Sequence, residues 1–165
     1  MLRPNETGGE RELSTFWRGI GERRGGEVGF RSFATYAGCS GDGPAGLAGL
    51  LYRVGERFWF EDFERDSWLL RILPPRRPFA KTEVSFERRA VTDVRIVSRG
   101  TALACLRGSL APAAAAPLGR VGRFFSTPVV QVTLDSGSAL FFEIMREREF
   151  LAELSVTATP GTPAR

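Results

Sequence analysis

The chain has 165 residues, a length that suits one domain with a hydrophobic core of its own. Its hydrophobic content of 42% and aromatic content of 11% are typical of a globular protein and exclude a largely disordered chain. The sequence contains no histidine, which excludes imidazole general bases, serine–histidine and cysteine–histidine catalytic pairs, and histidine-ligated metals.

Three observations predict a cytoplasmic location. The sequence has no apolar run long enough for a transmembrane helix. Its first residues, MLRPNETGGERELS, lack the apolar stretch of a secretory signal peptide. Cys39 and Cys105 lie far apart in the sequence and do not form a CxxC pair, so we interpret both as reduced thiols.

The positive charge is unevenly distributed along the chain, whose net charge is +4. Residues 99–127 contain four arginines and no acidic residue, whereas residues 128–165 contain three arginines and five acidic residues. A nucleic-acid-binding domain usually gathers its basic residues on one regular element, and no recognised nucleic-acid motif is present. Nucleic acid is therefore not expected as a partner.

The N-terminal part of the chain predicts helices. Residues 1–10 are polar and contain glycine, and we expect them to be disordered. The next apolar residues are spaced i, i+3, i+4 and i+7, as on one face of a helix: Leu13, Phe16, Trp17 and Ile20. A second short helix fits the similar spacing of Phe30, Phe33 and Tyr36. Together with the loop 39–46, residues 11–46 are expected to form a helical extension in front of the main body.

From residue 47 the hydrophobic pattern changes to a period of two, which is typical of half-buried strands in an antiparallel sheet. Seven strands are predicted, over 49–54, 57–63, 67–73, 81–87, 91–98, 129–134 and 139–144. Residues 135–138, DSGS, have the composition of a hairpin turn. The stretch MREREFLAELSV (145–156) predicts an amphipathic C-terminal helix, and residues 157–165 a disordered tail.

This order of elements resembles the pleckstrin homology (PH) superfold, including its bacterial PH-like and GRAM-like relatives. The resemblance covers residues 47–156 and rests on GLLYRVGERFWFEDF, which opens the sheet, and on FFEIMREREFLAEL, which closes it with a strand and a helix. It implies a bent barrel of seven antiparallel strands whose open end is capped by the C-terminal helix. We therefore expect a mainly β fold with an N-terminal helical extension and a long insert at 99–127. Lipocalin-like and other small barrels are the alternatives.

The stretch FWFEDFERDSW (58–68) combines five aromatic residues with four carboxylates. A calcium loop that begins at Asp62 would need a glycine and a glutamate where Ser67 and Leu73 stand. Paired carboxylates for acid–base catalysis would face each other across a cleft, whereas these are adjacent in the chain. We interpret them as a solvated strand end beside aromatic core residues, with a metal or catalytic site as the alternative. No catalytic residue, metal ligand or cofactor is assigned.

The insert 99–127 contains the candidate interaction site. Its centre, LAPAAAAPLG, is low in complexity and bracketed by prolines, and a long connection of this kind is often functional or mobile. Four candidate residues follow it closely: Arg120, Arg123, Phe124 and Phe125. Arginine beside exposed phenylalanine suits an anionic membrane surface or a groove on a partner protein. The alternative is that both phenylalanines anchor the insert to the barrel while both arginines are solvated.

These observations predict a non-enzymatic PH-like module that binds a partner protein as a scaffold. Trp17, on the apolar face of the N-terminal helix, is a further candidate contact. The first alternative is peripheral binding to an anionic membrane surface through residues 99–127. The second is an enzyme or a small-ligand carrier that uses the barrel interior, a hypothesis that a polar cavity in the barrel would favour.

Overall fold

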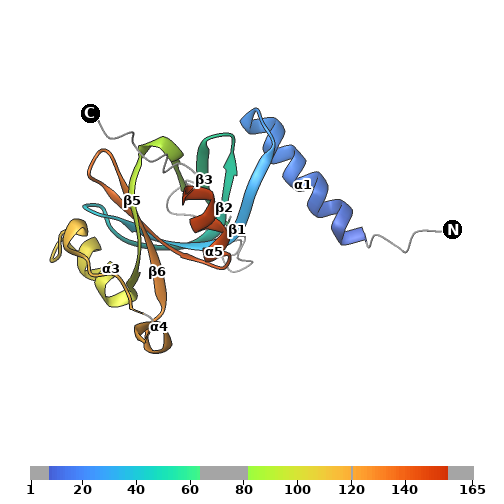
Figure 1. The fold of residues 1–165 in the computed structure, drawn as a ribbon. Helices are drawn as coiled ribbons and strands as arrows, with labels where there is room; N and C mark the ends of the chain where they lie inside the picture. The colour runs from blue at the N-terminus through green and yellow to red at the C-terminus, as the bar shows by residue number, and fades with distance from the viewer. Residues whose placement is uncertain (1–7, 64–81, 120, 156–165) are drawn as a thin grey trace, which may run out of the picture.

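The structure, a computed structural model, describes residues 8–63, 82–119 and 121–155. Its helices and strands run in the order α1 (Gly8–Arg24), β1 (Val28–Cys39), β2 (Gly43–Val54), β3 (Arg57–Asp62), β4 (Glu83–Glu87), β5 (Val91–Ser98), α3 (Arg99–Leu106), α4 (Gly122–Phe125), β6 (Pro128–Leu134), β7 (Ala139–Ile144) and α5 (Glu147–Ser155). Two short 3-10 helices, η1 (Arg88–Ala90) and η2 (Pro112–Ala114), complete the described elements. Figure 1 shows one curled sheet with helices placed around it.

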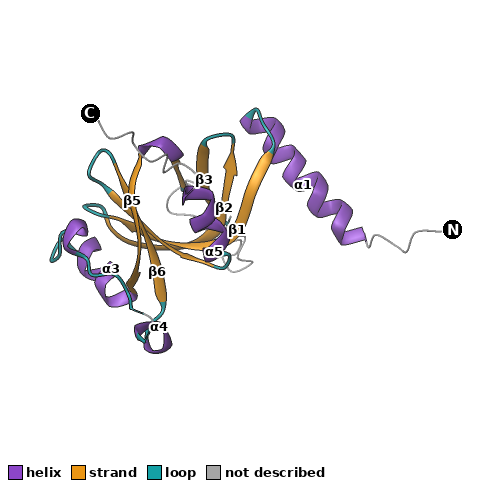
Figure 2. Cartoon of the chain, viewed as in Figure 1, coloured by secondary structure: helices purple, strands orange, loops and turns teal. Residues whose placement is uncertain are grey.

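The seven strands form a single antiparallel sheet in the order β4-β3-β2-β1-β7-β6-β5. β4 and β5 lie at opposite edges of this sheet, yet they are consecutive in the chain and joined only by η1. So short a connection can link two edge strands only because the sheet curls into a half-barrel, as Figure 2 shows. The predicted fold class, mainly β with seven antiparallel strands and a helix at each end, is confirmed.

β1 corrects the expectation of a second short helix within residues 11–46, which is wrong. The i, i+3, i+6 spacing of Phe30, Phe33 and Tyr36 fitted a helix, but in the strand Phe30 and Tyr36 are an even number of residues apart and point to the buried face, whereas Phe33 points to the exposed one. Pairing with both β2 and β7 places β1 at the centre of the sheet, and this tertiary context decides its structure. Residues 39–46 therefore contain the β1–β2 turn and link two paired strands.

The other described strands occur where the alternating pattern predicts them. β3, β4, β5, β6 and β7 fall within the predicted ranges to within two residues, and β2 begins earlier than predicted. The predicted strand 67–73 and the predicted disordered tail 157–165 lie outside the described residues. Of the N-terminal stretch 1–10, only residues 8–10 are described, and they begin α1.

The insert 99–127 starts with a helix that packs on the outer face of the sheet. The side chain of Ser98 caps α3 by accepting a hydrogen bond from the Thr101 amide at 3.0 Å. The helix buries Ala102, Cys105 and Leu106 against side chains of β5, β6 and β7: Val97, Val129, Ala139 and Phe141. The first part of the insert is thus a second layer on the sheet.

The low-complexity part of the insert is held on the sheet by hydrogen bonds to its backbone. Arg95 Nη1 donates to the carbonyl oxygens of Ala113 and Ala115, each at 3.1 Å. The fully buried Gln131 donates through Nε2 to the carbonyl oxygen of Pro112 at 3.0 Å. Two polar side chains of β5 and β6 therefore fix a segment that has few polar side chains of its own.

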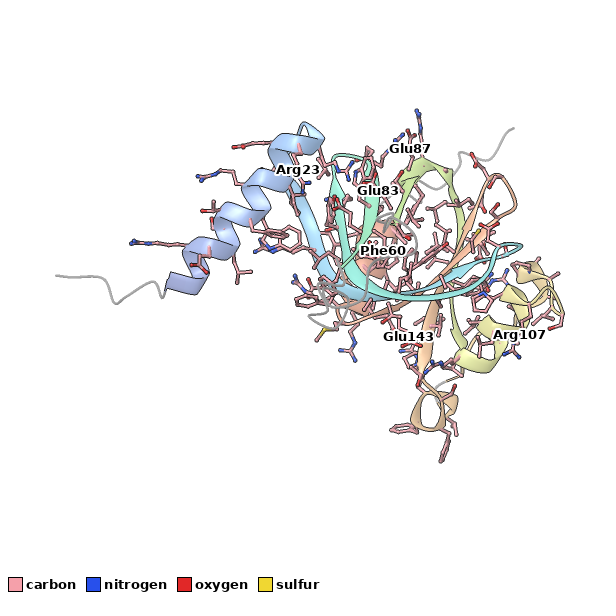
Figure 3. The ribbon with its side chains drawn as sticks, turned by 180° about the vertical axis from the view of Figure 1, so that it is seen from behind. Arg23, Phe60, Glu83, Glu87, Arg107 and Glu143 are labelled. Carbon is pink, nitrogen blue, oxygen red and sulfur yellow. The ribbon has the colours of Figure 1, made fainter. Side chains whose placement is uncertain are left out.

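Aromatic rings fill the inside of the curled sheet. Its buried aromatic side chains are Phe30, Tyr36, Phe58, Phe60, Phe86, Phe142 and Phe150. The ring of Phe142 lies 5.9 Å from that of Phe60 and 6.4 Å from that of Phe86, and Figure 3 shows Phe60 within the curl. α5 closes the open side with Phe150, whose ring meets that of Phe58 edge-on at 5.3 Å. The predicted C-terminal helix is thus part of the core.

Replacing Phe142 with alanine should lower the free energy of unfolding by about 3–5 kcal/mol, because it removes a fully buried ring and leaves a cavity between its neighbours. The matched control is Phe33→Ala, a phenylalanine of the same sheet that is 56% exposed, for which we expect a loss below about 1 kcal/mol. Urea denaturation of both variants measures the difference. Equal losses would contradict the position of the core.

Candidate functional site

The C-terminal half of α1 packs on the outer face of β2 and β3. Ile20 is 2% exposed and lies in a small apolar cluster with Tyr52 and Val54. Trp17 is half-buried, with its ring edge-on to that of Tyr52 at a centroid distance of 6.1 Å. Leu13 and Phe16, one turn earlier, are 60% and 47% exposed. The predicted apolar stripe is real, but only its second half contacts the sheet, and Figure 1 shows the first half projecting beyond it.

Arg24, in the last turn of α1, joins a cluster of side chains on the sheet. Its Nη2 lies 2.8 Å from Glu61 Oε1 and 2.5 Å from Glu83 Oε2. Its Nε donates to the hydroxyl of Tyr52 at 3.2 Å, and that hydroxyl donates in turn to the carboxylate of Glu61. The guanidinium also lies over the ring of Trp59, 3.8 Å from the ring centroid. One arginine thereby fastens α1 to β2, β3 and β4.

The cluster corrects the interpretation of the acidic–aromatic stretch as a solvated strand end. Glu61 is 6% exposed and Asp62 is 7% exposed, and Asp62 Oδ1 accepts a hydrogen bond from the Thr82 amide at 3.1 Å. Alternation along β3 turns Phe60 into the barrel and Glu61 outward, as predicted, but α1 covers that part of the outer face. The remaining members of the stretch, from Glu64 to Trp68, lie outside the described residues.

Sequence reasoning missed Arg24, although a signal for it was present. Arg24 stands four residues after Ile20 and so continues the apolar stripe of the helix with a positive charge. A cation on the buried face of a helix needs an anionic partner, and the outward-facing Glu61 of β3 is such a partner. The pairing joins residues that lie far apart in the sequence, so it becomes visible only when α1 is placed on the sheet.

Burial and hydrogen bonding shift the pKa values of Tyr52 and Arg24 in this cluster. Burial raises the pKa of Tyr52, and its hydrogen bond to Glu61 raises it further because ionisation would bring two negative charges together. Burial opposes the charge of Arg24, but hydrogen bonds to Glu83, Glu61 and Tyr52 outweigh it and raise the pKa of the guanidinium. Both shifts favour a protonated Tyr52 hydroxyl and a charged Arg24 guanidinium. The arrangement is that of a structural clamp.

Exposed apolar side chains occur on β1, just after β3, at α4 and just before α5. We call this set the apolar surface: Phe33, Phe63, Val121, Phe124, Phe125 and Met145, which are 43–86% exposed. Phe33, Phe63 and Met145 line a groove of about 380 Å³, with Thr127 and Pro128 along one side. The rings of Phe33 and Phe63 are in contact, 5.9 Å apart.

The chain runs from α4 directly into the groove wall at Thr127. Arg123 Nη1 lies 3.5 Å from Glu147 Oε1, an ion pair that ties α4 to the first residue of α5, two positions after Met145. Phe124 and Phe125, each 86% exposed, follow Arg123 on the same short helix. Figure 1 shows α4 at one end of the molecule, away from the barrel.

The candidate interaction residues thus divide into three groups. Phe124 and Phe125 are exposed, so the alternative that they anchor the insert to the barrel is wrong. Arg123 is partly exposed and paired with Glu147, whereas Arg120 lies outside the described residues. Trp17 belongs to the contact between α1 and the sheet. Sequence reasoning did not assign Phe33, Phe63 or Met145, because exposure of single apolar residues has no local sequence signal.

Comparisons with known proteins assign no family to the chain: no protein-family model, no curated protein and no solved structure matches it. Within the described ranges, no helix combines the length and the apolar character that are needed to cross a bilayer. The described residues also contain no group of three or more cysteine, aspartate or glutamate side chains placed to hold a metal ion.

Replacing Arg24 with methionine should lower the free energy of unfolding by about 2–4 kcal/mol, since it removes a mostly buried cation that pairs with the buried Glu61. The control is Arg23→Met, one residue earlier on the exposed side of the helix, with an expected change within about 0.5 kcal/mol. Urea denaturation compares the two. A loss in Arg24→Met no larger than that of the control would show that the cluster does not stabilise the fold.

Both tyrosines of the chain should make stability fall at alkaline pH. Burial raises the pKa of Tyr36 to about 12, and the pKa of Tyr52 is raised as well, against about 10 in the unfolded chain. The folded state then holds these protons more tightly, so their contribution is complete below about pH 10 and is lost as the pH rises toward the folded values. Denaturation at a series of pH values measures the fall, and Tyr36→Phe should reduce it. A fall of the same size in that variant would show that Tyr36 does not contribute to the loss of stability at alkaline pH.

Proposed function

We propose that the chain is a non-enzymatic, PH-like interaction module that binds a partner protein through the apolar surface. The single observation that carries the proposal is the groove lined by Phe33, Phe63 and Met145, beside the exposed phenylalanines of α4. A curled sheet of seven antiparallel strands with a C-terminal helix in its core supports the PH-like part of the proposal, although the central strand β1 lies before residues 47–156, over which the resemblance was drawn.

The apolar surface has the composition of a binding site. Large apolar side chains that cluster on a folded surface usually mark a contact with another molecule, and aromatic residues and methionine are enriched at protein interfaces. Met145 is 78% exposed, and its flexible thioether adapts to different partner side chains. Phe33 and Phe63 already pack against each other, so that less side-chain entropy is lost when a partner binds.

The surroundings of the groove favour a protein partner with an apolar anchor residue. A groove of about 380 Å³ accommodates one or two large side chains. Charged residues close to the groove in the chain are paired: Arg123 with Glu147, and Arg99 Nε with Oε1 of the groove residue Glu143 at 3.7 Å. An apolar centre with a polar rim is the usual anatomy of a protein–protein contact.

The barrel interior and the Arg24 cluster support the non-enzymatic part of the proposal. The interior is filled by aromatic rings in contact with one another. These residues therefore form a packed apolar core, whereas an enzyme or a ligand carrier would use a polar cavity. The buried carboxylate Glu61 is held by Arg24 and Tyr52 as an internal fastening.

A second candidate function, binding to an anionic membrane surface, is favoured by α4. Val121, Phe124 and Phe125 are spaced i, i+3 and i+4 and are 71–86% exposed at one end of the molecule. Arginine next to exposed aromatic residues suits the headgroup region of a bilayer. The ion pair of Arg123 with Glu147 reduces the local excess of positive charge, and we therefore place a protein partner first.

Peptides selected on the full-length chain from a random peptide library should share a large apolar residue, and the double variant Phe33→Thr, Met145→Gln should weaken their binding by at least about tenfold. Threonine keeps the β propensity of the strand while it removes the ring. Leu13→Gln, which alters an exposed leucine outside the apolar surface, is the control and should leave affinity unchanged. Fluorescence anisotropy with labelled peptides measures the affinities.

The outcome that overturns a protein partner is the absence of enriched peptides, or equal affinity for the double variant. Flotation with vesicles of anionic and of neutral lipid, at low and high salt, then tests the second candidate. Flotation that needs anionic lipid, falls with salt and disappears in Phe124→Ser, Phe125→Ser would make membrane binding the function.

A further inference from the structure

Arg88, in η1, is a half-buried arginine whose side chain is largely covered and whose hydrogen-bonding groups are largely unpaired. Its side chain is 10% exposed. Neither its Nε nor its Nη2 has a hydrogen-bond partner among the described residues, and both atoms are buried. Among the described residues, the carboxylate nearest to it is that of Glu56, whose Oε2 is 4.0 Å from the remaining nitrogen, Nη1, and which is itself 68% exposed. A buried N–H group without a hydrogen-bond acceptor destabilises a fold, so this arrangement needs a physical explanation.

The two unpaired nitrogens form one edge of the planar guanidinium. The N–H groups of Nε and Nη2 are parallel, and their spacing matches two oxygen atoms of one carboxylate or one phosphate group. A single oxyanion would therefore satisfy both donors at once. Water or a hydroxyl group would satisfy only one of them well.

Arg53, a neighbouring arginine on β2, shows the contrast. Its Nε is also buried and unpaired, but its Nη1 donates to the carbonyl oxygen of Gly55 at 2.6 Å and its Nη2 lies 3.0 Å from Glu153 Oε2. Arg53 thus holds α5 to the sheet, and the Nε–Nη2 edge of its guanidinium is already occupied at Nη2 by Glu153. Arg88 makes no comparable contact within the described residues.

Arg88 lines a hollow of about 700 Å³ between the start of β5 and the end of α5. The other lining groups include Arg89, Thr92 and Ser155. The acidic residue that lines the hollow, Asp93, is held by Arg95 Nε at 2.5 Å. Its negative charge is therefore balanced locally, and it does not serve as the partner of Arg88.

We propose that this hollow binds an oxyanion, a carboxylate or a phosphate group, on the Nε–Nη2 edge of Arg88. Both nitrogens are covered in this conformation, so binding requires the guanidinium to turn toward the hollow. Arg89, which is 83% exposed and pairs with Glu87 at 2.5 Å, stands at the same hollow as an auxiliary cation. The proposal goes beyond the partner-binding function, because the hollow shares no residue with the apolar surface.

The test titrates the full-length chain, labelled with ¹⁵N, with inorganic phosphate, with acetate and with chloride at constant ionic strength. The arginine Nε–H signals report contacts of individual guanidinium groups. We expect the signal of Arg88 to shift in a saturable way with phosphate or acetate and not with chloride, and the melting temperature to rise in parallel. Binding by phosphate alone identifies a phosphoryl ligand, and binding by acetate alone identifies a carboxylate ligand; either supports the site, as does binding by both.

Two variants locate the effect. Arg88→Lys keeps the positive charge but removes the paired edge, and should weaken anion binding by at least about tenfold. Arg89→Lys changes a cation at the same hollow that is already paired, and should weaken binding by less than about threefold. The proposal is overturned if no anion gives a saturable shift, or if Arg88→Lys binds as well as the unaltered chain. If Arg88→Lys fails to fold, the Nε–H titration of the unaltered chain decides alone.

Discussion

The short connection η1 between β4 and β5 is the constraint on which the rest of the structure depends. It forces the two edges of a seven-stranded sheet toward each other, and the sheet therefore has an inside and an outside. The inside is narrow enough to be filled by aromatic rings, and α5 supplies the last of them, Phe150. Hydrophobic burial there is the main favourable term of folding, and every other element is arranged around it.

The curled sheet also has an outer face, and the apolar parts of that face are stable only when another element covers them. α1 covers it over β2 and β3, where Ile20 and Trp17 meet Tyr52. α3 covers it over β5, β6 and β7, where Cys105 and Leu106 are buried. Between the two helices a strip of the face remains open, and the groove at Phe33 lies in it. The candidate binding surface is thus a consequence of how two helices divide the outer face.

The sequence predicted the parts of this architecture that depend on local pattern. The alternation in β3, β5 and β7, the hairpin between β6 and β7, and the amphipathic C-terminal helix were all legible from a few neighbouring residues. β1 could not be predicted, because the spacing of Phe30, Phe33 and Tyr36 fits a helix while Phe30 and Tyr36 alone also fit one face of a strand. Pairing with β2 and β7 makes the segment a strand.

The functional features were harder to predict for the same reason. α3 carries small apolar residues without a polar face, so its sequence resembles a loop until a sheet is placed beneath it. The clamp at Arg24 and the groove at Phe33 both depend on which part of the outer face a helix covers. Of the apolar surface, only Phe124 and Phe125 were named in advance, and their sequence also fitted an anchored role.

The burial of Cys105 provides a way to measure local opening of the insert. Its thiol is 1% exposed beneath α3, and burial raises its pKa, so that a thiol reagent reaches it as a thiolate only after α3 leaves the sheet. The rate at which Cys105 is alkylated therefore measures how often the insert opens locally, on a timescale that can be much shorter than global unfolding. Cys39, half-buried, ends the central strand β1.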